Sequence, residues 1–261
     1  MKYTVDNDRD FYLAVKDAND GDEILVYPGE YFKPDDTPIL TIKNNISIVG
    51  ETSDFDAVCL NCGFLVGKKN IFILNNLSIN YNDEKGNTLA LYDGAEFYGN
   101  NIVLNHSATN EWNTIYCQNS SISLNDSEII NSNKDNIPAI MMENSQMLAI
   151  NSSIYFPALR SSDCILKDSF ISYSLCLQNK SSLNFDDITI DSNNNTEFSD
   201  FYLDNKSIVE GSNITFVKDN PSIDIFASQF ETNDFLSDFD KINWHFDDES
   251  TVWADGYELL N

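Results

Sequence analysis

The most informative stretch of the sequence is residues 115–130, which read IYCQNSSISLNDSEII. It contains three short apolar segments, and Asn, Ser and Asp separate them. Apolar residues that alternate at a period of two are typical of β-strands with one buried face. Asn, Ser and Asp are typical turn residues because their side chains bond to nearby backbone groups. The stretch therefore predicts three short strands joined by polar turns.

This unit recurs along the chain. It aligns with residues 140–154, 158–172, 175–190 and 201–216, and a shorter motif, NNISI at 44–48, returns as NNLSI at 75–79 and NNIVL at 100–104. The turn positions of the aligned units are Asn119, Asn144, Ser162, Asn179 and Asn205. Self-similarity at this spacing indicates a solenoid. Because the repeated segments are strands and too short for propeller blades, we expect an all-β parallel β-helix in a single-stranded coil.

Both ends of such a stack need covers, since a strand edge left open pairs with other chains. An apolar stripe at Phe11, Ala14, Val15 and Ala18 predicts a short N-terminal capping helix, with Asp8 or Asp10 as its N-cap. We expect one domain over residues 1–261. Its parts are a helical cap at 1–21, coils at 22–218 and an acidic, aromatic C-terminal cap at 219–261.

The start of the coil region carries a family resemblance. After the predicted helix, residues 21–31 read GDEILVYPGEY, and residues 45–50 form an apolar strand, NISIVG, that ends in Gly. These features resemble the opening of the pectin-lyase-like right-handed parallel β-helix superfamily. The resemblance implies a right-handed coil. It does not define an activity, because this fold hosts lyases, hydrolases, esterases and non-catalytic binders.

The charge balance narrows the range of partners. The chain has 42 acidic and 15 basic residues, a formal net charge of −27 and a pI near 4.1. Nucleic acid and anionic membranes are disfavoured, because both require clustered Lys and Arg. A glycan, an unidentified protein or a basic protein partner fits better. The alternative is that the charge only keeps the stack soluble.

Neither a membrane span nor a signal peptide is evident. No run of about 18 apolar residues occurs. The first residues, MKYTVDNDRDFYLAV, lack the basic and apolar regions of a secretory signal. We therefore expect a cytoplasmic location and leave extracellular export by another route open. The five Cys are odd in number and most are far apart, although Cys59 and Cys62 form a C-x-x-C. They predict free thiols rather than a disulfide framework.

The enzymes of the superfamily imply motifs that can be sought here. Their hydrolases carry G-H and R-I-K motifs, and this sequence has neither. The remaining catalytic candidate is Arg160 with Asp163 and Asp168, for which the alternative is a surface ion pair. Asp186 and Asp187 are the candidate metal ligands, for which the alternative is a solvated turn. We expect no cofactor, with calcium as the open alternative.

Two alignment columns supply candidate ligand-binding residues. Tyr116, Met141, Cys176 and Tyr202 share a position whose neighbours point inward, so their side chains should face outward and contact a ligand or pack under a loop. Lys180 and Lys206 share a turn column, in which the alignment also places Asp163. That column predicts either recognition of an acidic ligand or a solubilising edge. His106 and His245 are expected to be structural or surface residues.

The missing motifs favour a non-catalytic β-helix module that recognises a protein or glycan through one extended face. A carbohydrate-active enzyme, either a polysaccharide lyase or a hydrolase, is the alternative that the resemblance implies. A further alternative is an acidic interaction or inhibitor protein that engages a basic partner.

Overall fold

The computed structural model describes residues 2–32, 38–109, 111–132, 136–195, 197–234 and 241–260. It is 58% strand and 6% helix, and its coils form a right-handed parallel β-helix, which confirms the predicted fold class. Contacts divide the chain into two compact units, Met1–Ala139 (unit 1) and Ile140–Asn261 (unit 2). The expectation of a single domain with two caps stays a prediction.

Unit 1 begins with the expected helix. α1 spans Asp8–Asp17 and buries Phe11, Ala14 and Val15. Its N-cap is Asn7, whose side chain accepts a hydrogen bond from the Asp10 backbone N–H, so the expectation of an Asp8 or Asp10 cap is wrong. Asn, like Asp, caps well because its side-chain oxygen satisfies an orphan backbone donor.

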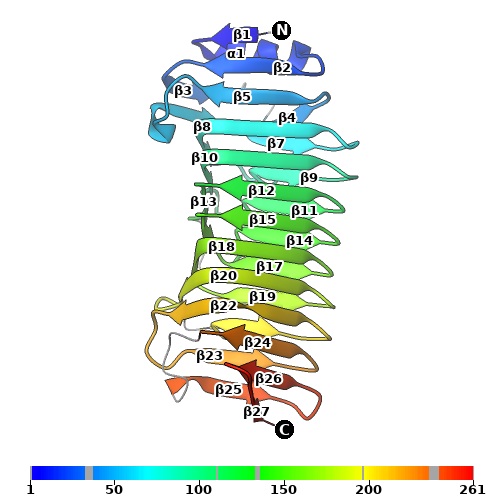
Figure 1. The fold of residues 1–261 in the computed structure, drawn as a ribbon. Coiled ribbons are helices and arrows are strands. Elements are labelled where there is room, and N and C mark those ends of the chain that lie inside the picture. The colour runs from blue at the N-terminus through cyan, green and yellow to red at the C-terminus, as the bar shows by residue number, and fades with distance from the viewer. Residues whose placement is uncertain are drawn as a thin grey trace. The chain divides into compact units, whose positions relative to one another are not determined.

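The coils of unit 1 have three faces of parallel strands, called the first, second and third sheets, and the first two are joined by long strands that run across both (Figure 1). The first sheet contains β1 (Lys2–Val5), β2 (Asp22–Val26), β5 (Ile46–Gly50), the first half of β8 (Ile71–Tyr81), the first half of β10 (Glu96–His106) and β12 (Ser121–Asn125). The second contains β3 (Gly29–Phe32), β6 (Val58–Asn61), the second halves of β8 and β10, and β13 (Glu128–Asn131). The third contains β4 (Ile39–Ile42), β7 (Gly63–Val66), β9 (Leu89–Leu91) and β11 (Ile115–Gln118). A 3-10 turn, η1 (Phe55–Ala57), precedes β6.

Unit 2 repeats this arrangement. Its first sheet contains β15 (Gln146–Ile150), the first halves of β18 (Asp163–Ser172), β20 (Ser182–Asp191) and β22 (Ile208–Phe216), then β24 (Gln229–Asn233), β26 (Thr251–Ala254) and the antiparallel β27 (Tyr257–Leu260). Its second contains β16 (Ser153–Tyr155) and the second halves of β18, β20 and β22. Its third contains β14 (Ile140–Glu143), β17 (Pro157–Arg160), β19 (Leu175–Gln178), β21 (Phe201–Leu203), β23 (Ser222–Ile225) and β25 (Asn243–Phe246).

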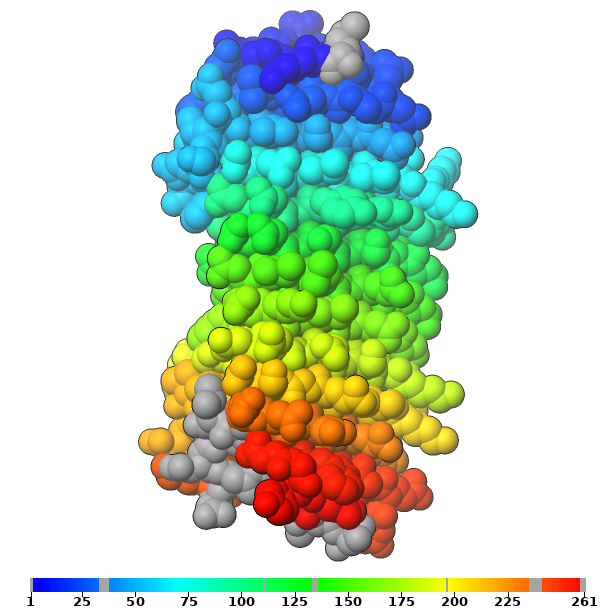
Figure 2. All heavy atoms as spheres, viewed as in Figure 1, coloured from blue at the N-terminus to red at the C-terminus, as the bar shows by residue number. Residues whose placement is uncertain are grey.

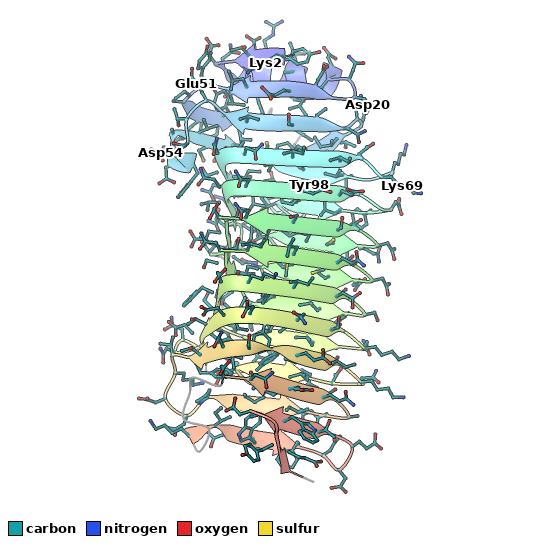
Figure 3. All side chains as sticks on the ribbon, in the orientation of Figure 1. Lys2, Asp20, Glu51, Asp54, Lys69 and Tyr98 are labelled. Carbon is teal, nitrogen blue, oxygen red and sulfur yellow. The ribbon has the colours of Figure 1, made fainter. Side chains whose placement is uncertain are left out.

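Like residues stack along the inside of each unit. In unit 1 the rings of Phe64, Phe72 and Phe97 are almost fully buried, and the Phe72 centroid lies 5.0 Å from that of Phe64 and 6.0 Å from that of Phe97. Full burial of each such side chain stabilises the fold by about 1.5–3 kcal/mol. Figure 2 shows the atoms of successive coils of unit 1 as successive bands of colour. In Figure 3, Tyr98 lies on the outward side of β10, where its hydroxyl donates to Glu96 Oε2 at 2.8 Å.

A column of left-handed residues separates the first and second sheets of each unit. Its members are Asn76, Asn101 and Asp126 in unit 1, and Asn151, Asp168, Asp187 and Asn213 in unit 2. Their φ angles lie between 47° and 59°. Among residues other than Gly, Asn and Asp enter this conformation most readily. The columns therefore account for much of the Asn and Asp in the repeats.

The structure changes the alignment in two places. The turn that follows β17 has its left-handed residue at Ser161 rather than Ser162. The corresponding turn of the next coil contains one more residue, because Asn179 and Lys180 both have positive φ. Asp163 consequently pairs with Ser182 and does not share a column with Lys180. Asp187 corresponds to Asp126 in the left-handed column.

Candidate functional site

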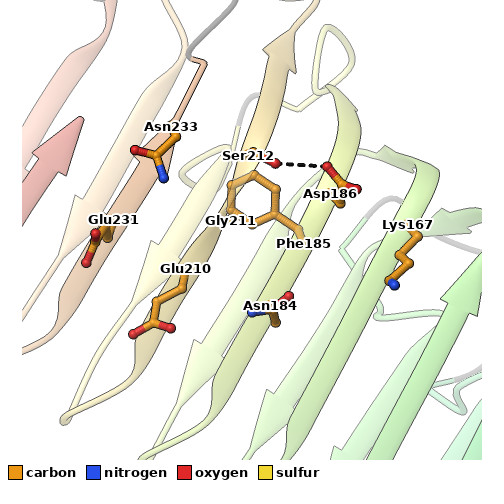
Figure 4. Close-up of a pocket in the computed structure, with 9 residues that line it drawn as sticks. All are labelled: Lys167, Asn184, Phe185, Asp186, Glu210, Gly211, Ser212, Glu231 and Asn233. Carbon is orange, nitrogen blue, oxygen red and sulfur yellow. Dashed lines mark hydrogen bonds between the residues drawn. The ribbon is translucent and has the colours of Figure 1, made fainter. Parts of the chain in front are cut away.

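The outward face of the first sheet of unit 2 carries a groove of about 510 Å³ (Figure 4). Strands β18, β20, β22 and β24 form its floor. The groove is lined by Lys167, Asn184, Phe185, Asp186, Glu210, Gly211, Ser212, Glu231 and Asn233. Three carboxylates and one ammonium group thus face one polar hollow.

One side of the groove is a column of hydrogen-bonding side chains. Parallel pairing places Lys167 beside Asp186, Asp186 beside Ser212, and Ser212 beside Asn233. The Ser212 hydroxyl donates to Asp186 Oδ1 at 2.8 Å, as the dashed line in Figure 4 marks. This bond occupies one oxygen of the Asp186 carboxylate.

The neighbouring column contains a pair of uncommitted carboxylates. Asn184, Glu210, Glu231 and Trp253 lie in direct register on β20, β22, β24 and β26. All four are exposed. Within the part of unit 2 that the structure describes, the side chains of Glu210 and Glu231 form no hydrogen bond or ion pair. Both carboxylates are therefore available to a ligand.

A close approach of backbone and ring shapes the base of the groove. Phe185 is buried, and Gly211 lies beside it on β22. A Cβ atom at position 211 would lie 2.4 Å from the Phe185 carbonyl oxygen and 2.5 Å from the Phe185 ring. Gly211 is therefore required for β22 to pack on β20, and this packing sets the positions of Glu210 and Ser212 on either side.

Arg160 lies apart from the groove and ends β17 on the third sheet. Its Nε donates to Gln178 Oε1 at 3.2 Å, and its guanidinium lies 3.9 Å from the Glu143 carboxylate. Among the described residues these are its polar partners, so the structure does not pair Arg160 with Asp163 or Asp168. Asp163 instead accepts a hydrogen bond from the Ser182 hydroxyl.

The other two candidate acids meet at a second hollow of about 380 Å³ in unit 2. Asp168 and Asp187 are adjacent in the left-handed column, and Asn151, Ser153 and Thr189 lie around them. Asp186, the other half of the predicted metal pair, points into the first groove. The structure thus separates Asp186 from Asp187. Over the described ranges, no three His, Cys, Asp or Glu side chains gather closely enough to hold a metal ion, and calcium stays a prediction.

The aromatic and lysine candidates lie on other surfaces. In unit 2, Met141 and Tyr202 are half-buried positions of one third-sheet column, with Ala158 and Cys176 between them. In unit 1, Tyr116 is half-buried, and its ring lies 5.6 Å from that of Tyr92.

Lys180 and Lys206 are exposed in left-handed turns that stack, with the Asn205 side-chain amide donating to Asn179 Oδ1 at 2.7 Å. Neither lysine lines the hollows of about 510 and 380 Å³. Their role in binding an acidic ligand stays a prediction.

Glu210, Glu231 and Trp253 were not predicted as site residues from the sequence. Each occupies an outward position of a period-two strand, which was the available signal, but only the coil register shows that they are neighbours. A cluster near the third sheet was not predicted either: His245 Nδ1 lies 2.8 Å from Asp224 Oδ1, and the Ser199 hydroxyl donates to Asp224 Oδ2. His245 belongs to this exposed pair, as expected for a surface histidine.

The chain was compared with known proteins. No protein-family model matches it, and no curated protein matches it. A PL6 family alginate lyase, AlyGC, is 10% identical over all of this chain and 52% of its own, with a TM-score of 0.48. An alginate lyase from Paenibacillus is 9% identical over 98% of both chains, with a TM-score of 0.39. A PL6 family polysaccharide lyase from Pseudopedobacter saltans is 11% identical over 98% and 94%, with a TM-score of 0.35.

These similarities concern the fold alone, and the chain spans about half the length of AlyGC. The expected right-handed β-helix is confirmed, and no subfamily is identified. The non-catalytic recognition module expected from the sequence is not supported by these findings. No helix in the described ranges has the length and hydropathy to cross a bilayer.

Proposed function

We propose that the chain is a carbohydrate-active enzyme, a glycoside hydrolase that acts at the groove of unit 2. The observation that carries the proposal is the Glu210–Glu231 pair, two exposed and uncommitted carboxylates in direct register on adjacent strands. Glycoside hydrolysis requires two such groups on either side of the scissile bond. The groove around them is open and polar, which suits a sugar chain.

The strand spacing favours one stereochemical course. Adjacent strands lie about 4.7–4.9 Å apart, which fits the ~5–5.5 Å separation of the carboxyl groups in retaining hydrolases. In that course one carboxylic acid protonates the leaving glycosidic oxygen as the C–O bond breaks, while the other carboxylate attacks the anomeric carbon. Water then cleaves the glycosyl ester, and the first group accepts a proton from that water. Retention of the anomeric configuration is the expected result.

The side chains around the pair support positioning of a substrate. Asn184 and Asn233 offer both donors and acceptors to sugar hydroxyls. Asp186, held by Ser212, offers an oriented acceptor. Elimination from a uronate, the reaction of a lyase, requires neutralisation of the sugar carboxylate as well as a base. Lys167 is the single cation among the residues that line the groove, so the lining favours hydrolysis.

The test is a screen of oligosaccharides that detects new reducing ends and, separately, the ultraviolet absorbance of unsaturated products. Glu210→Gln and Glu231→Gln should each reduce kcat about 10²- to 10⁴-fold, the range of a general acid or base. Glu128→Gln, an exposed acid on β13 in unit 1, is the matched control and should leave the rate unchanged.

Three results would reject the proposal. Unsaturated products without hydrolysis would identify a lyase. Tight glycan binding without any cleavage would restore the non-catalytic module. Full activity in both Gln variants would place the chemistry elsewhere on the chain.

A further inference from the structure

We infer that the groove takes a neutral or amino-sugar glycan, not a polyuronate, and that the sugar chain crosses the strands and stacks one ring on Trp253. This inference rests on the proposed function, since it assigns a substrate class and a binding residue to the same groove. Two independent observations lead to it: the charge of the lining, and the exposed indole at the end of the carboxylate column.

The charge of the groove opposes a polyanion. Asp186, Glu210 and Glu231 face Lys167, which leaves the lining with a formal charge of −2. The whole chain carries a net charge of −27, which has the same sign. Like charges placed together suppress the wrong partner, and a net negative charge slows the approach of a polyanion. A uronate at each sugar would meet this repulsion along the groove, whereas a hydroxyl or ammonium group would not.

Trp253 supplies an aromatic surface beside the carboxylates. It lies on β26 in register with Glu231, and 39% of it is exposed. Within the described residues its indole N–H has no hydrogen-bond partner, so it can donate to a ligand. Its strand, β26, pairs with β24 on one side and with the antiparallel β27 on the other. An indole ring has an apolar face and one polar N–H group, so it suits a sugar ring, which presents both C–H groups and hydroxyls.

The direction of the sugar chain follows from the column. Glu210, Glu231 and Trp253 are outward residues of three successive strands, so they lie on a line across the strands. At the other end of the column, Asn184 is followed by the exposed Ile165 on β18. A chain lying along a single strand would meet only one of these residues. A chain lying across the strands contacts the carboxylate pair and reaches the indole.

The experiment measures binding of three probes by calorimetry: a cello-oligosaccharide, a chitosan oligosaccharide and an oligoalginate. Wild-type protein should bind the first two and not the third, and binding of the chitosan probe should weaken as salt screens the charges. Trp253→Ala should weaken binding on the order of tenfold, as expected for loss of an aromatic contact. Trp112→Ala, an exposed tryptophan of unit 1, is the control and should bind as wild type does.

The outcomes separate this inference from the hydrolase proposal. Oligoalginate binding tighter than the other probes would overturn the substrate class, and wild-type affinity in Trp253→Ala would overturn the stacking site. Loss of cleavage in Glu210→Gln would leave the hydrolase proposal standing in either case. If instead Trp253→Ala weakens binding while both Gln variants stay fully active, the inference holds and the carboxylate mechanism fails. Absence of binding for all three probes would overturn the inference.

Discussion

Gly211 offers a direct test of the packing that builds the groove. A methyl group at this position would lie 2.4 Å from the Phe185 carbonyl oxygen and 2.5 Å from the Phe185 ring. The ring can shift at a cost, but the carbonyl belongs to the β20 backbone and cannot turn away. Overpacking of a filled core typically costs about 1–3 kcal/mol. We therefore expect Gly211→Ala to lose about 3 kcal/mol of unfolding free energy, a large part of the ~5–15 kcal/mol typical of a domain.

Urea denaturation followed by circular dichroism measures this loss. With a slope of up to about 3 kcal/mol per molar, the midpoint should fall by about 1 M or more. Gly67→Ala is the matched control, because its nearest neighbour, the Tyr92 carbonyl oxygen, lies 3.8 Å from the added atom. That variant should stay within about 0.5 kcal/mol of wild type. If Gly211→Ala proved as stable as wild type, the packing of Phe185 on Gly211, and with it the register of the groove, would be wrong.

Three further predictions concern the coils of unit 2. Asn213→Val should destabilise the protein by about 1–2 kcal/mol in urea denaturation, because Asn213 has a left-handed φ of 59° that a β-branched residue disfavours. Asn213→Gly is the control and should be tolerated, since Gly adopts this φ readily. Lys218→Met should lower the unfolding free energy by about 3–5 kcal/mol in thermal and urea unfolding, because the fully buried Asp200 carboxylate loses the ammonium group 2.9 Å away. Lys2→Met, which breaks an exposed ion pair, is the control and should lower it by at most ~1 kcal/mol. Hydrogen bonds from the Ser250 hydroxyl and then the Ala227 backbone N–H hold the pKa of Asp247 below its ordinary value. The stability this contributes is present above the unfolded pKa of ~3.9 and is lost as pH falls through the folded pKa. Asp247→Asn should thus have a lower unfolding free energy than wild type at pH 6, and the two values should converge in acid. The same dependence of stability on pH in both proteins would contradict these hydrogen bonds.

Local sequence patterns were sufficient to predict the coil. The apolar stripe at Phe11, Ala14 and Val15 became α1. The turn residues Asn119, Asn144, Asn179 and Asn205 all adopt positive φ. These predictions succeeded because alternation, capping and turn chemistry act within a few residues of the chain.

The site depended on information that local patterns do not carry. Glu210, Glu231 and Trp253 are far apart in sequence and meet only through the pairing of β22, β24 and β26. A turn that is longer by one residue, such as Asn179–Lys180, shifts an alignment without changing its local pattern. That shift placed Asp163 in the same column as Lys180. The pairing of Asp186 with Asp187 failed for another reason: the two acids are adjacent in sequence, but their side chains line different hollows.

A crystal structure of the Glu231→Gln variant with a bound cello- or chito-oligosaccharide would show whether the groove of unit 2 binds the glycan. We expect sugar density across β22, β24 and β26, with a glycosidic oxygen between residues 210 and 231 and one ring stacked on Trp253. Sugar bound instead at the third sheet, beside Asp224 and His245, or at the hollow between Asp168 and Asp187, would contradict this expectation.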